Sequence, residues 1–217
     1  MADENRIAPD RGSGPGLEVT NLSVERGGRR ILSDLSFTVT AGEALLVRGP
    51  NGSGKTTLLR TIAGFLSPIS GHIRLTGDEE QPLTERIHYV GHLNGVRASL
   101  TVEENVRFWA SYLGGSEDRV SAALERFGLA SLASIPTGYL SAGQRRRLAL
   151  VRPLLAFRPL WLLDEPSTSL DARSTAVLAG AIDEHVSSGG IVVAATHLEL
   201  GIARSRELRL GFAAEQA

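Results

Sequence analysis

The residues best suited to do chemistry in this chain form the glycine-rich stretch Gly49-Pro50-Asn51-Gly52-Ser53-Gly54-Lys55-Thr56. Its spacing, G-x-x-x-x-G-K-[ST], is that of a phosphate-binding loop. Glycines let successive backbone N–H groups turn toward one anion, and the start of a following helix adds unsatisfied donors and its positive dipole end. Lys55 is then expected to reach the β- and γ-phosphates of a nucleoside triphosphate, and the Thr56 hydroxyl to ligate Mg²⁺.

A second candidate group is the acidic pair Asp164-Glu165, which follows the apolar run 160–164. We expect Asp164 to hold Mg²⁺ beside Thr56. Glu165, pointing the opposite way on the strand, could orient and deprotonate an attacking water. A lone acidic pair after a strand is usually a turn or a helix cap, but the Lys-Thr loop upstream favours a catalytic role.

The elements around the loop are of the kind that would position it. Residues 43–48 predict a short buried strand and residues 57–63 a helix, with Gly64 placed to end it. The alternative is a glycine-rich turn before an ordinary helix, which the Lys-Thr pair disfavours. A further buried strand at 191–195 ends just before Thr196 and His197.

Outside this region the pattern predicts antiparallel strands first and helices later. Residues 17–24 alternate as a half-exposed strand does, and 26–29 form a hairpin-like turn. After residue 100 a capping signal at Thr101 precedes a helix whose apolar stripe is expected to be core: Val102, Val106, Trp109 and Leu113. Pro153 falls inside a later helix, where we expect it to cause a kink and crowd the Ala149 carbonyl.

Three more motifs carry a resemblance to a known family. Leu140-Ser141-Ala142-Gly143-Gln144 closely resembles the Leu-Ser-Gly-Gly-Gln signature of ABC ATPases. Residues 164–171 resemble the Walker B and D-loop run of that family, and His197 falls where its switch histidine sits. The resemblance extends over nearly the whole chain, from residue 17 to about residue 211, and five ordered motifs at compatible separations make it specific.

The resemblance implies a fold and a division of the chain. The fold class is α/β, a P-loop NTPase with an ABC-type nucleotide-binding domain that combines a RecA-like core, an antiparallel β subdomain and an α-helical subdomain. The ABC ATPase domain would comprise residues 17–211, with the helical subdomain at about 93–156. Residues 1–16 are expected to be a flexible leader and 212–217 a tail.

The resemblance also implies roles for single residues and a second copy of the chain. Lys55, Glu165 and His197 would be catalytic, and Asp171 would link two sites across a dimer interface. ATP, with Mg²⁺ on Thr56 and Asp164, would be bound by Gly49, Pro50, Asn51, Gly52, Ser53, Gly54, Lys55, Thr56 and Thr57. Two copies would close head-to-tail around two ATP molecules, each gripping its partner's nucleotide with Ser141, Ala142, Gly143 and Gln144.

Two positions depart from the family pattern. His92 stands where most relatives have a glutamine that touches Mg²⁺ and water and faces the membrane partner; we hypothesise that His92 keeps this coupling role. Arg26 stands where an aromatic ring commonly stacks on adenine. Its guanidinium plane could stack on the base as well, or it could be a solvated turn residue.

Composition limits the remaining possibilities. The 217 residues carry 23 Lys and Arg against 24 Asp and Glu, so the net charge of −1 offers no global field for nucleic acid. The absence of cysteine excludes disulfides and thiolate metal sites. No apolar run approaches the roughly 20 residues of a membrane span. The chain is therefore expected to be cytosolic, or peripheral on the cytosolic face of a membrane.

Subfamily resemblance rests on Tyr89-Val90-Gly91-His92, on the signature run and on Val193-Ala194-Ala195-Thr196-His197. These look like the ATP-binding subunits of the bacterial cytochrome c maturation system, described as haem exporter ATPases. That implies a peripheral position on the inner membrane, a separate integral membrane subunit, and hydrolysis that releases a haem-loaded chaperone. We expect no direct haem binding, because the five histidines are scattered. The alternatives are the ATPase of another small-molecule exporter, a soluble ABC regulator without a transport partner, or a module without turnover.

Overall fold

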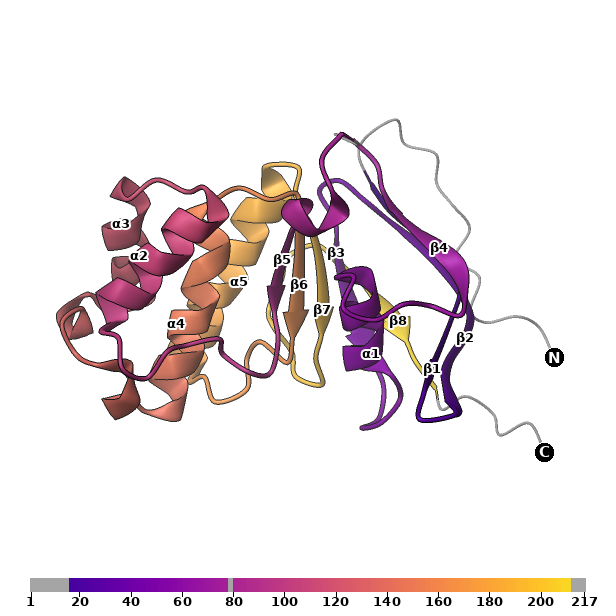
Figure 1. Ribbon diagram of the computed structural model, residues 1–217, viewed down its shortest axis with the longest axis horizontal. Helices are drawn as coiled ribbons and strands as arrows, with labels where there is room; N and C mark the ends of the chain where they lie inside the picture. Colours follow the sequence, from indigo (N-terminus) through magenta and orange to yellow (C-terminus); the bar gives the residue numbers. More distant parts are fainter. Residues whose placement is uncertain (1–15, 78–79, 212–217) are drawn as a thin grey trace.

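The computed structural model describes residues 16–77 and 80–211 and has layers of helices on a central parallel sheet (Figure 1). The sheet has the strand order β5-β6-β7-β3-β8. Most of these strand residues are apolar and buried, as expected for a parallel sheet covered on both faces. The strands are β3 (Ala44–Arg48), β5 (Ile87–Val90), β6 (Leu160–Asp164), β7 (Ile191–Ala195) and β8 (Ser205–Arg209).

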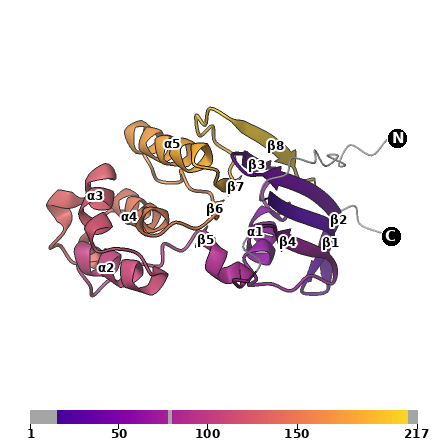
Figure 2. The same ribbon diagram turned by 90° about the horizontal axis from the view of Figure 1, so that it is seen from above.

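A second, antiparallel sheet covers one side of the molecule, in the order β2-β1-β4. Helix α1 (Lys55–Ile62) lies between the two sheets (Figure 2). Apolar side chains of both sheets and of this helix form one buried cluster, in which the helix packs against β6 and β7. The strands of this sheet are β1 (Gly16–Arg26), β2 (Arg29–Thr40) and β4 (Ser70–Leu75).

Four further helices lie on the other side of the parallel sheet. Their apolar residues form one core with that sheet face, so the helical segment shares its core with the strands. The helices are α2 (Val102–Leu113), α3 (Asp118–Arg126), α4 (Ala142–Leu155) and α5 (Ala172–Ser187). Short 3₁₀ turns lie at Leu83–Arg86, Ala130–Leu132 and Thr137–Tyr139.

The described residues contain no helix that is both long and apolar enough to cross a bilayer. The predicted leader falls outside the described residues except for Gly16, which begins β1, and the predicted tail falls outside them entirely. The α/β class and the two-sheet arrangement predicted from the sequence are confirmed.

The capping signal of α2 is confirmed, whereas its apolar stripe is core only in part. Thr101 Oγ1 accepts a hydrogen bond from Glu104 N at 3.2 Å, and Thr101 N donates to Glu104 Oε2 at 2.8 Å. Val102 and Val106 are buried, but Trp109 and Leu113 are only half-buried and line a surface groove. Trp109 still packs against the core, so the prediction holds for it in part, whereas it was wrong for Leu113. An apolar stripe does not show whether a further element covers its end.

Helix α4 continues through Pro153 to Leu155. Proline has no N–H, so the carbonyl of Ala149 loses its usual helical donor. The side chain of Arg152 replaces it, because Arg152 Nε donates to Ala149 O at 3.1 Å. The helix thereby keeps this carbonyl hydrogen-bonded and holds the Arg152 side chain against its own backbone.

Two histidines are buried near the end of the sheet that is remote from the phosphate loop. His88 contacts Ala156 O through Nε2 at 2.8 Å, and His185 stacks on Trp161 with ring centroids 4.1 Å apart. Burial lowers the pKa of each imidazole to about 4. Both side chains are therefore neutral in the folded protein at neutral pH.

These lowered pKa values predict a loss of stability in acid. Unfolded histidine takes up a proton near pH 6.5, whereas the folded side chains do so only near pH 4, so stability is lost as pH falls through that window. His185→Phe keeps an aromatic ring at this position but removes the titrating group. It should reduce the slope of the unfolding free energy against pH by about 1 kcal/mol per pH unit within that window. Urea titrations at several pH values measure this, with the exposed His72→Gln as control. Equal slopes in His185→Phe and wild type would contradict it.

Candidate functional site

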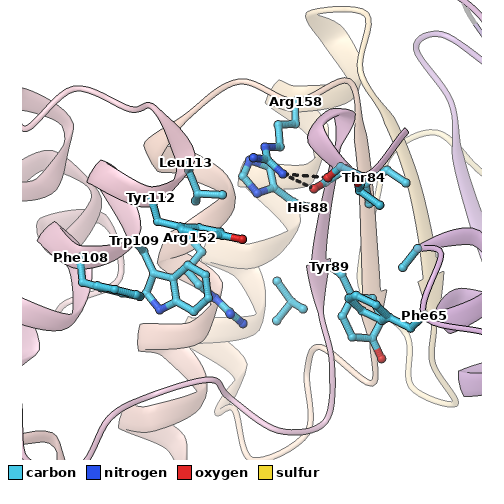
Figure 3. Close-up of a pocket in the computed structure, with 13 residues that line it drawn as sticks. Phe65, Thr84, His88, Tyr89, Phe108, Trp109, Tyr112, Leu113, Arg152 and Arg158 are labelled. Atoms are coloured by element: carbon cyan, nitrogen blue, oxygen red, sulfur yellow. Dashed lines mark hydrogen bonds between the residues drawn. The ribbon is translucent and has the colours of Figure 1, made fainter. Parts of the chain in front are cut away.

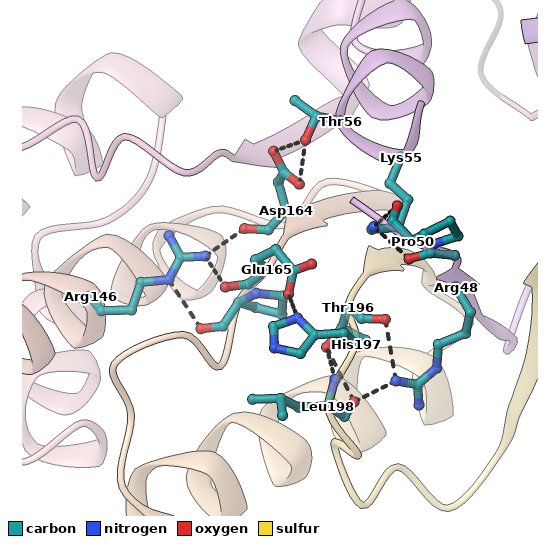
Figure 4. Close-up of polar contacts among 12 residues, drawn as sticks. Arg48, Pro50, Lys55, Thr56, Arg146, Asp164, Glu165, Thr196, His197 and Leu198 are labelled. Atoms are coloured by element: carbon teal, nitrogen blue, oxygen red, sulfur yellow. Dashed lines mark hydrogen bonds and ion pairs between the residues drawn. The ribbon is translucent and has the colours of Figure 1, made fainter. Parts of the chain in front are cut away.

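The phosphate loop connects β3 to α1 at the carboxyl end of the parallel sheet (Figure 4). Gly54, the residue before the helix, has φ 98°, a left-handed conformation that favours glycine. Pro50, Asn51 and Gly52 are exposed at the tip of the loop, while Ser53 is buried. The sequence thus places an open, glycine-rich turn directly at a helix start.

Lys55 lies across this loop with only 8% of its surface exposed. Its Nζ donates to Gly49 O at 2.8 Å and to Pro50 O at 3.0 Å. Thr56 is half-exposed at the mouth of the loop, and Thr57 is buried behind it. The positive charge expected for phosphate binding is therefore held within the loop itself.

Asp164 is the last residue of β6 and faces the start of α1. Its two carboxylate oxygens accept from Thr56 Oγ1 at 3.1 and 3.0 Å. Burial raises the pKa of the Asp164 carboxyl, while the hydrogen bond from Thr56 acts in the opposite direction. Two side chains from distant parts of the sequence thus present oxygen atoms at one place.

Glu165 and His197 are brought together, a contact that the sequence did not predict. His197 Nδ1 donates to Glu165 Oε2 at 2.8 Å. Glu165 lies beyond the last residue of β6, with φ 48°, and its N–H donates to Ala195 O at 2.8 Å. Its side chain diverges from that of Asp164 because of this left-handed turn, and not because of the alternation along a strand as we expected.

Arg48 supports the loop that carries His197. Its Nη1 donates to Thr196 O at 3.2 Å and to Leu198 O at 2.8 Å, so the residues on both sides of His197 are held by the end of β3. Sequence reasoning treated Arg48 only as the end of a strand. Its position directly before the phosphate loop is the one feature of the sequence that could have indicated a role for Arg48 in the site.

The signature stretch lies at the start of α4. Ser141 caps the helix: its Oγ accepts from Gln144 N at 3.2 Å, and Gln144 Oε1 accepts from Ser141 N at 2.7 Å. Ser141 and Ala142 are exposed, and Gly143 and Gln144 half-buried. A Cβ on Gly143 would lie 2.8 Å from Ser169 O, so glycine is needed for the approach of the loop before α5.

Asp171 caps α5 by accepting a 2.7 Å hydrogen bond from Ser174 N. Hydrogen bonds from the side chain and the backbone of Ser174 lower the pKa of its carboxyl. Asp171 is exposed, as is Ser169 two residues before it. Among the described residues, the hydrogen bonds of the Ser141–Gln144 turn do not reach the phosphate loop of the same chain. Ser141 and Asp171 are therefore surface helix caps within this copy.

The two departures from the family pattern are both exposed at the surface. His92 follows β5 and is exposed beside Phe65 and Arg60 in a shallow pocket. Arg26 is exposed at the end of β1, opposite Arg29 in the hairpin. The structure does not give either residue a hydrogen bond to Thr56, Asp164 or Glu165 among the described residues.

Arg146 is the main residue that sequence reasoning missed. It is 4% exposed and donates to the backbone carbonyl oxygens of Asp164 and Glu165. It lies in the run Arg145-Arg146-Arg147. Three consecutive helical residues span about 200° of the helix surface, so the run by itself does not show which of them faces the sheet.

Comparisons with known proteins agree with the motifs. Residues 32–168 match the family model described as ABC transporter. The chain is 50% identical over 199 residues to the "Cytochrome c biogenesis ATP-binding export protein CcmA" of Chelativorans sp. (strain BNC1), covering 90% of this chain and 98% of that protein. The protein of the same name from Rhizobium meliloti (strain 1021) is 48% identical, covering 89% and 97%.

Solved structures show the same fold. "Structure of ATP binding subunit of ABC transporter" matches with a TM-score of 0.76 and 29% identity over 84% of this chain and 80% of that one. A putative ABC transporter ATP-binding protein from Pyrococcus furiosus matches with a TM-score of 0.76 and 27% identity, covering 90% and 97%.

The packing of Gly49 allows a direct test of the loop. A Cβ at this position would lie 2.4 Å from Leu210 O and 2.7 Å from Ser53 Oγ, and φ is 150°. Gly49→Ala should therefore displace the loop and weaken binding of a fluorescent ATP analogue at least tenfold. Gly189→Ala is the control for left-handed strain alone, because nothing lies within 4 Å of its Cβ. Unchanged affinity in Gly49→Ala would show that the loop does not bind the nucleotide.

Proposed function

Since the chain belongs to the ABC transporter family of ATP-binding proteins and, within it, to the CcmA group, we propose that it hydrolyses ATP in a bacterial membrane complex for haem export in cytochrome c maturation. Hydrolysis would drive release of a haem-loaded chaperone. The biological role is supported by the sequence identity of 47–50%, over about 90% of the chain, to cytochrome c biogenesis export proteins. The contact between Glu165 and His197 beside the Asp164–Thr56 pair supports turnover.

ATP would be bound through its phosphates by the backbone of the loop and by Lys55, whose ammonium already lies among the loop carbonyls. Thr56 and Asp164 fit Mg²⁺, because both present oxygen, the donor atom that this ion prefers, and because Asp164 is a buried carboxylate without an ion pair among the described residues. When bound, Mg²⁺ supplies charge neutralisation at the phosphate oxygens. In the same proposal, Arg26 stacks on the adenine base.

Glu165 would act as the general base that takes a proton from the attacking water. The hydrogen bond from His197 Nδ1 fixes one carboxylate oxygen and leaves the other free for the water. It also fixes the orientation of the imidazole, and Nε2 can donate to the γ-phosphate only when the ring carries a proton on both nitrogens. Arg48, through the carbonyls on both sides of His197, keeps this pair in register with the phosphate loop.

The site would be completed by a second copy of the chain. Ser141, Ala142, Gly143 and Gln144 form a helix start at the surface, with the first two exposed and the last two half-buried. Such a helix start can bind anions through its free N–H groups and its dipole. In a head-to-tail dimer this helix start would meet the γ-phosphate bound by the other copy, and the exposed Asp171 would lie at the interface. Such a dimer requires these residues to be accessible in the single copy, and Ser141, Ala142 and Asp171 are exposed there.

A membrane subunit would dock in a groove of about 380 Å³ between α2 and β5 (Figure 3). Aromatic rings line it, among them Tyr89, Trp109 and Tyr112, and Arg152 lies 4.7 Å from the centre of the Trp109 ring. Burial and the nearby Arg146 lower the pKa of Arg152 to about 10, and no carboxylate of the described residues pairs with it. The groove therefore suits an amphipathic segment that carries an acidic side chain.

This docking would place the chain at the cytoplasmic face of the inner membrane, as a peripheral subunit. His92 is exposed next to the groove, which is consistent with a coupling role for its loop. In this proposal the haem contacts the other subunits, and the chain itself binds none.

Glu165→Gln tests the catalytic assignment. The amide cannot accept the water's proton, so kcat for phosphate release should fall at least 100-fold. The affinity for ATP should stay within about twofold, and gel filtration with ATP should show an accumulated dimer. Glu184→Gln, an exposed acid paired with Arg126, is the control. Turnover near the wild-type rate in Glu165→Gln would contradict the mechanism.

Complementation tests the biological role and the groove together. In a bacterium lacking its own cytochrome c biogenesis ATP-binding subunit, this chain should restore c-type cytochromes, seen by staining of covalently bound haem in gels. Tyr112→Glu, at a 70% exposed position of the groove, should not restore them, although the purified variant still hydrolyses ATP. Ile69→Glu, on an exposed turn elsewhere, should behave as wild type. Failure of the wild type would refute the cytochrome c role, and success of Tyr112→Glu would refute docking in the groove.

A further inference from the structure

We propose that Arg146 is a positioning residue that mechanically links the His92 loop to the catalytic Glu165. The proposal rests on the proposed ATPase function and deepens it. The observation behind it is a single buried guanidinium that joins three segments far apart in the sequence. Figure 4 shows its contacts with the segment after β6.

All five N–H donors of Arg146 are matched by oxygen acceptors. On the side of the loop after β5, Nη1 donates to Gly91 O at 2.8 Å and to Asn94 Oδ1 at 3.2 Å. On the side of the loop after β6, Nη2 donates to Asp164 O at 2.7 Å and to Glu165 O at 2.9 Å. Nε completes the set with Pro166 O at 3.1 Å.

The acceptors are four backbone carbonyls and one side-chain amide, and none of them is a carboxylate. A guanidinium is planar and presents its donors in a fixed fork, so it constrains direction as well as distance. Contacts to backbone atoms fix where each loop lies. Arg146 therefore acts as a rigid spacer between the residues on both sides of His92 and the residue proposed as general base.

The same residue lies on the signature helix. Arg146 follows Ser141 by five residues, about 7.5 Å along the axis of α4. A movement of the His92 loop would thus be transmitted through one side chain both to Glu165 and to the helix whose start would contact the partner copy's ATP. Neither the phosphate loop nor Lys55 is among its contacts in the described residues.

Glu165 has a particular need for such support. Its φ of 48° is a left-handed conformation that a residue other than glycine keeps only when its surroundings impose it. Its N–H is held by Ala195 O and its carbonyl by Arg146, so both sides of the turn are fixed. Without Arg146, the Glu165 carboxylate would keep its chemistry but lose its fixed position.

The test separates positioning from simple packing by comparing kcat with KM. In the purified full-length chain, Arg146→Lys and Arg146→Gln should lower kcat for ATP hydrolysis by about 10- and 100-fold, since misplacement of a catalytic group by about 1 Å costs this order. The KM and the affinity for ATP should stay within about twofold. Lysine should rescue in part, because three donors on one atom cannot reach all five acceptors. Equal loss of kcat and ATP affinity, or wild-type kcat in both variants, would overturn the proposal.

A double-mutant cycle tests the link itself. Asn94→Ala removes one acceptor on the His92 side and should lower kcat about threefold, with KM unchanged. Added to Arg146→Gln, it should cause no further loss, because the connection is already broken. Independent, multiplicative effects would overturn the link. If the Arg146 variants fail to fold, Asn94→Ala alone decides, and an unchanged kcat overturns the proposal.

Two controls distinguish failure of the proposed Arg146 link from failure of the proposed ATPase function. Arg126→Gln removes a half-buried arginine of α3 that is paired with Glu184 of α5, and it should leave kcat unchanged. If Glu165→Gln retains turnover, the ATPase assignment itself is wrong. If Glu165→Gln is inactive while the Arg146 variants are fully active, only the link is refuted.

Discussion

The register of the parallel sheet is the constraint on which the candidate site depends. Val47 on β3 pairs with Ala195 on β7, and Ala195 pairs in turn with Asp164 on β6. Because the strands are parallel, their carboxyl ends lie at one level, and the three loops that follow begin side by side. The phosphate loop, the acidic pair and His197 meet there although about 150 residues separate the first from the last.

Much of this arrangement could be predicted from sequence, because it follows from local chemistry. The glycine spacing before Lys55, the apolar run before Asp164 and the capping box at Thr101 each specify one element by short-range rules. The contact between His197 and Glu165 could not be predicted in the same way. It depends on a left-handed turn after β6 and on strand order, and neither is encoded within a short window.

Arg146 and Trp109 show that burial cannot be predicted from sequence pattern alone: one is more buried than its pattern suggests and the other less. The pattern assigned Trp109 to the core, but the groove beside α2 leaves it half-exposed. Arg146 belongs to a basic run that suggests a solvated face, yet it is buried with all its donors satisfied. The residue type gives only the usual environment of a side chain. Whether a particular arginine can be buried depends on whether the tertiary structure supplies enough hydrogen-bond acceptors for its donors.

The proline of α4 has a consequence for the shape of the groove. Because Pro153 leaves the Ala149 carbonyl without its helical donor, Arg152 is tied to its own helix through Nε, and the remainder of its guanidinium stays over Trp109. An ordinary surface arginine samples many rotamers, and ordering it on binding carries an entropic penalty. Here the missing helical hydrogen bond at Pro153 has already restricted the rotamers of Arg152. Its guanidinium is therefore pre-organised for an anionic group before that group binds.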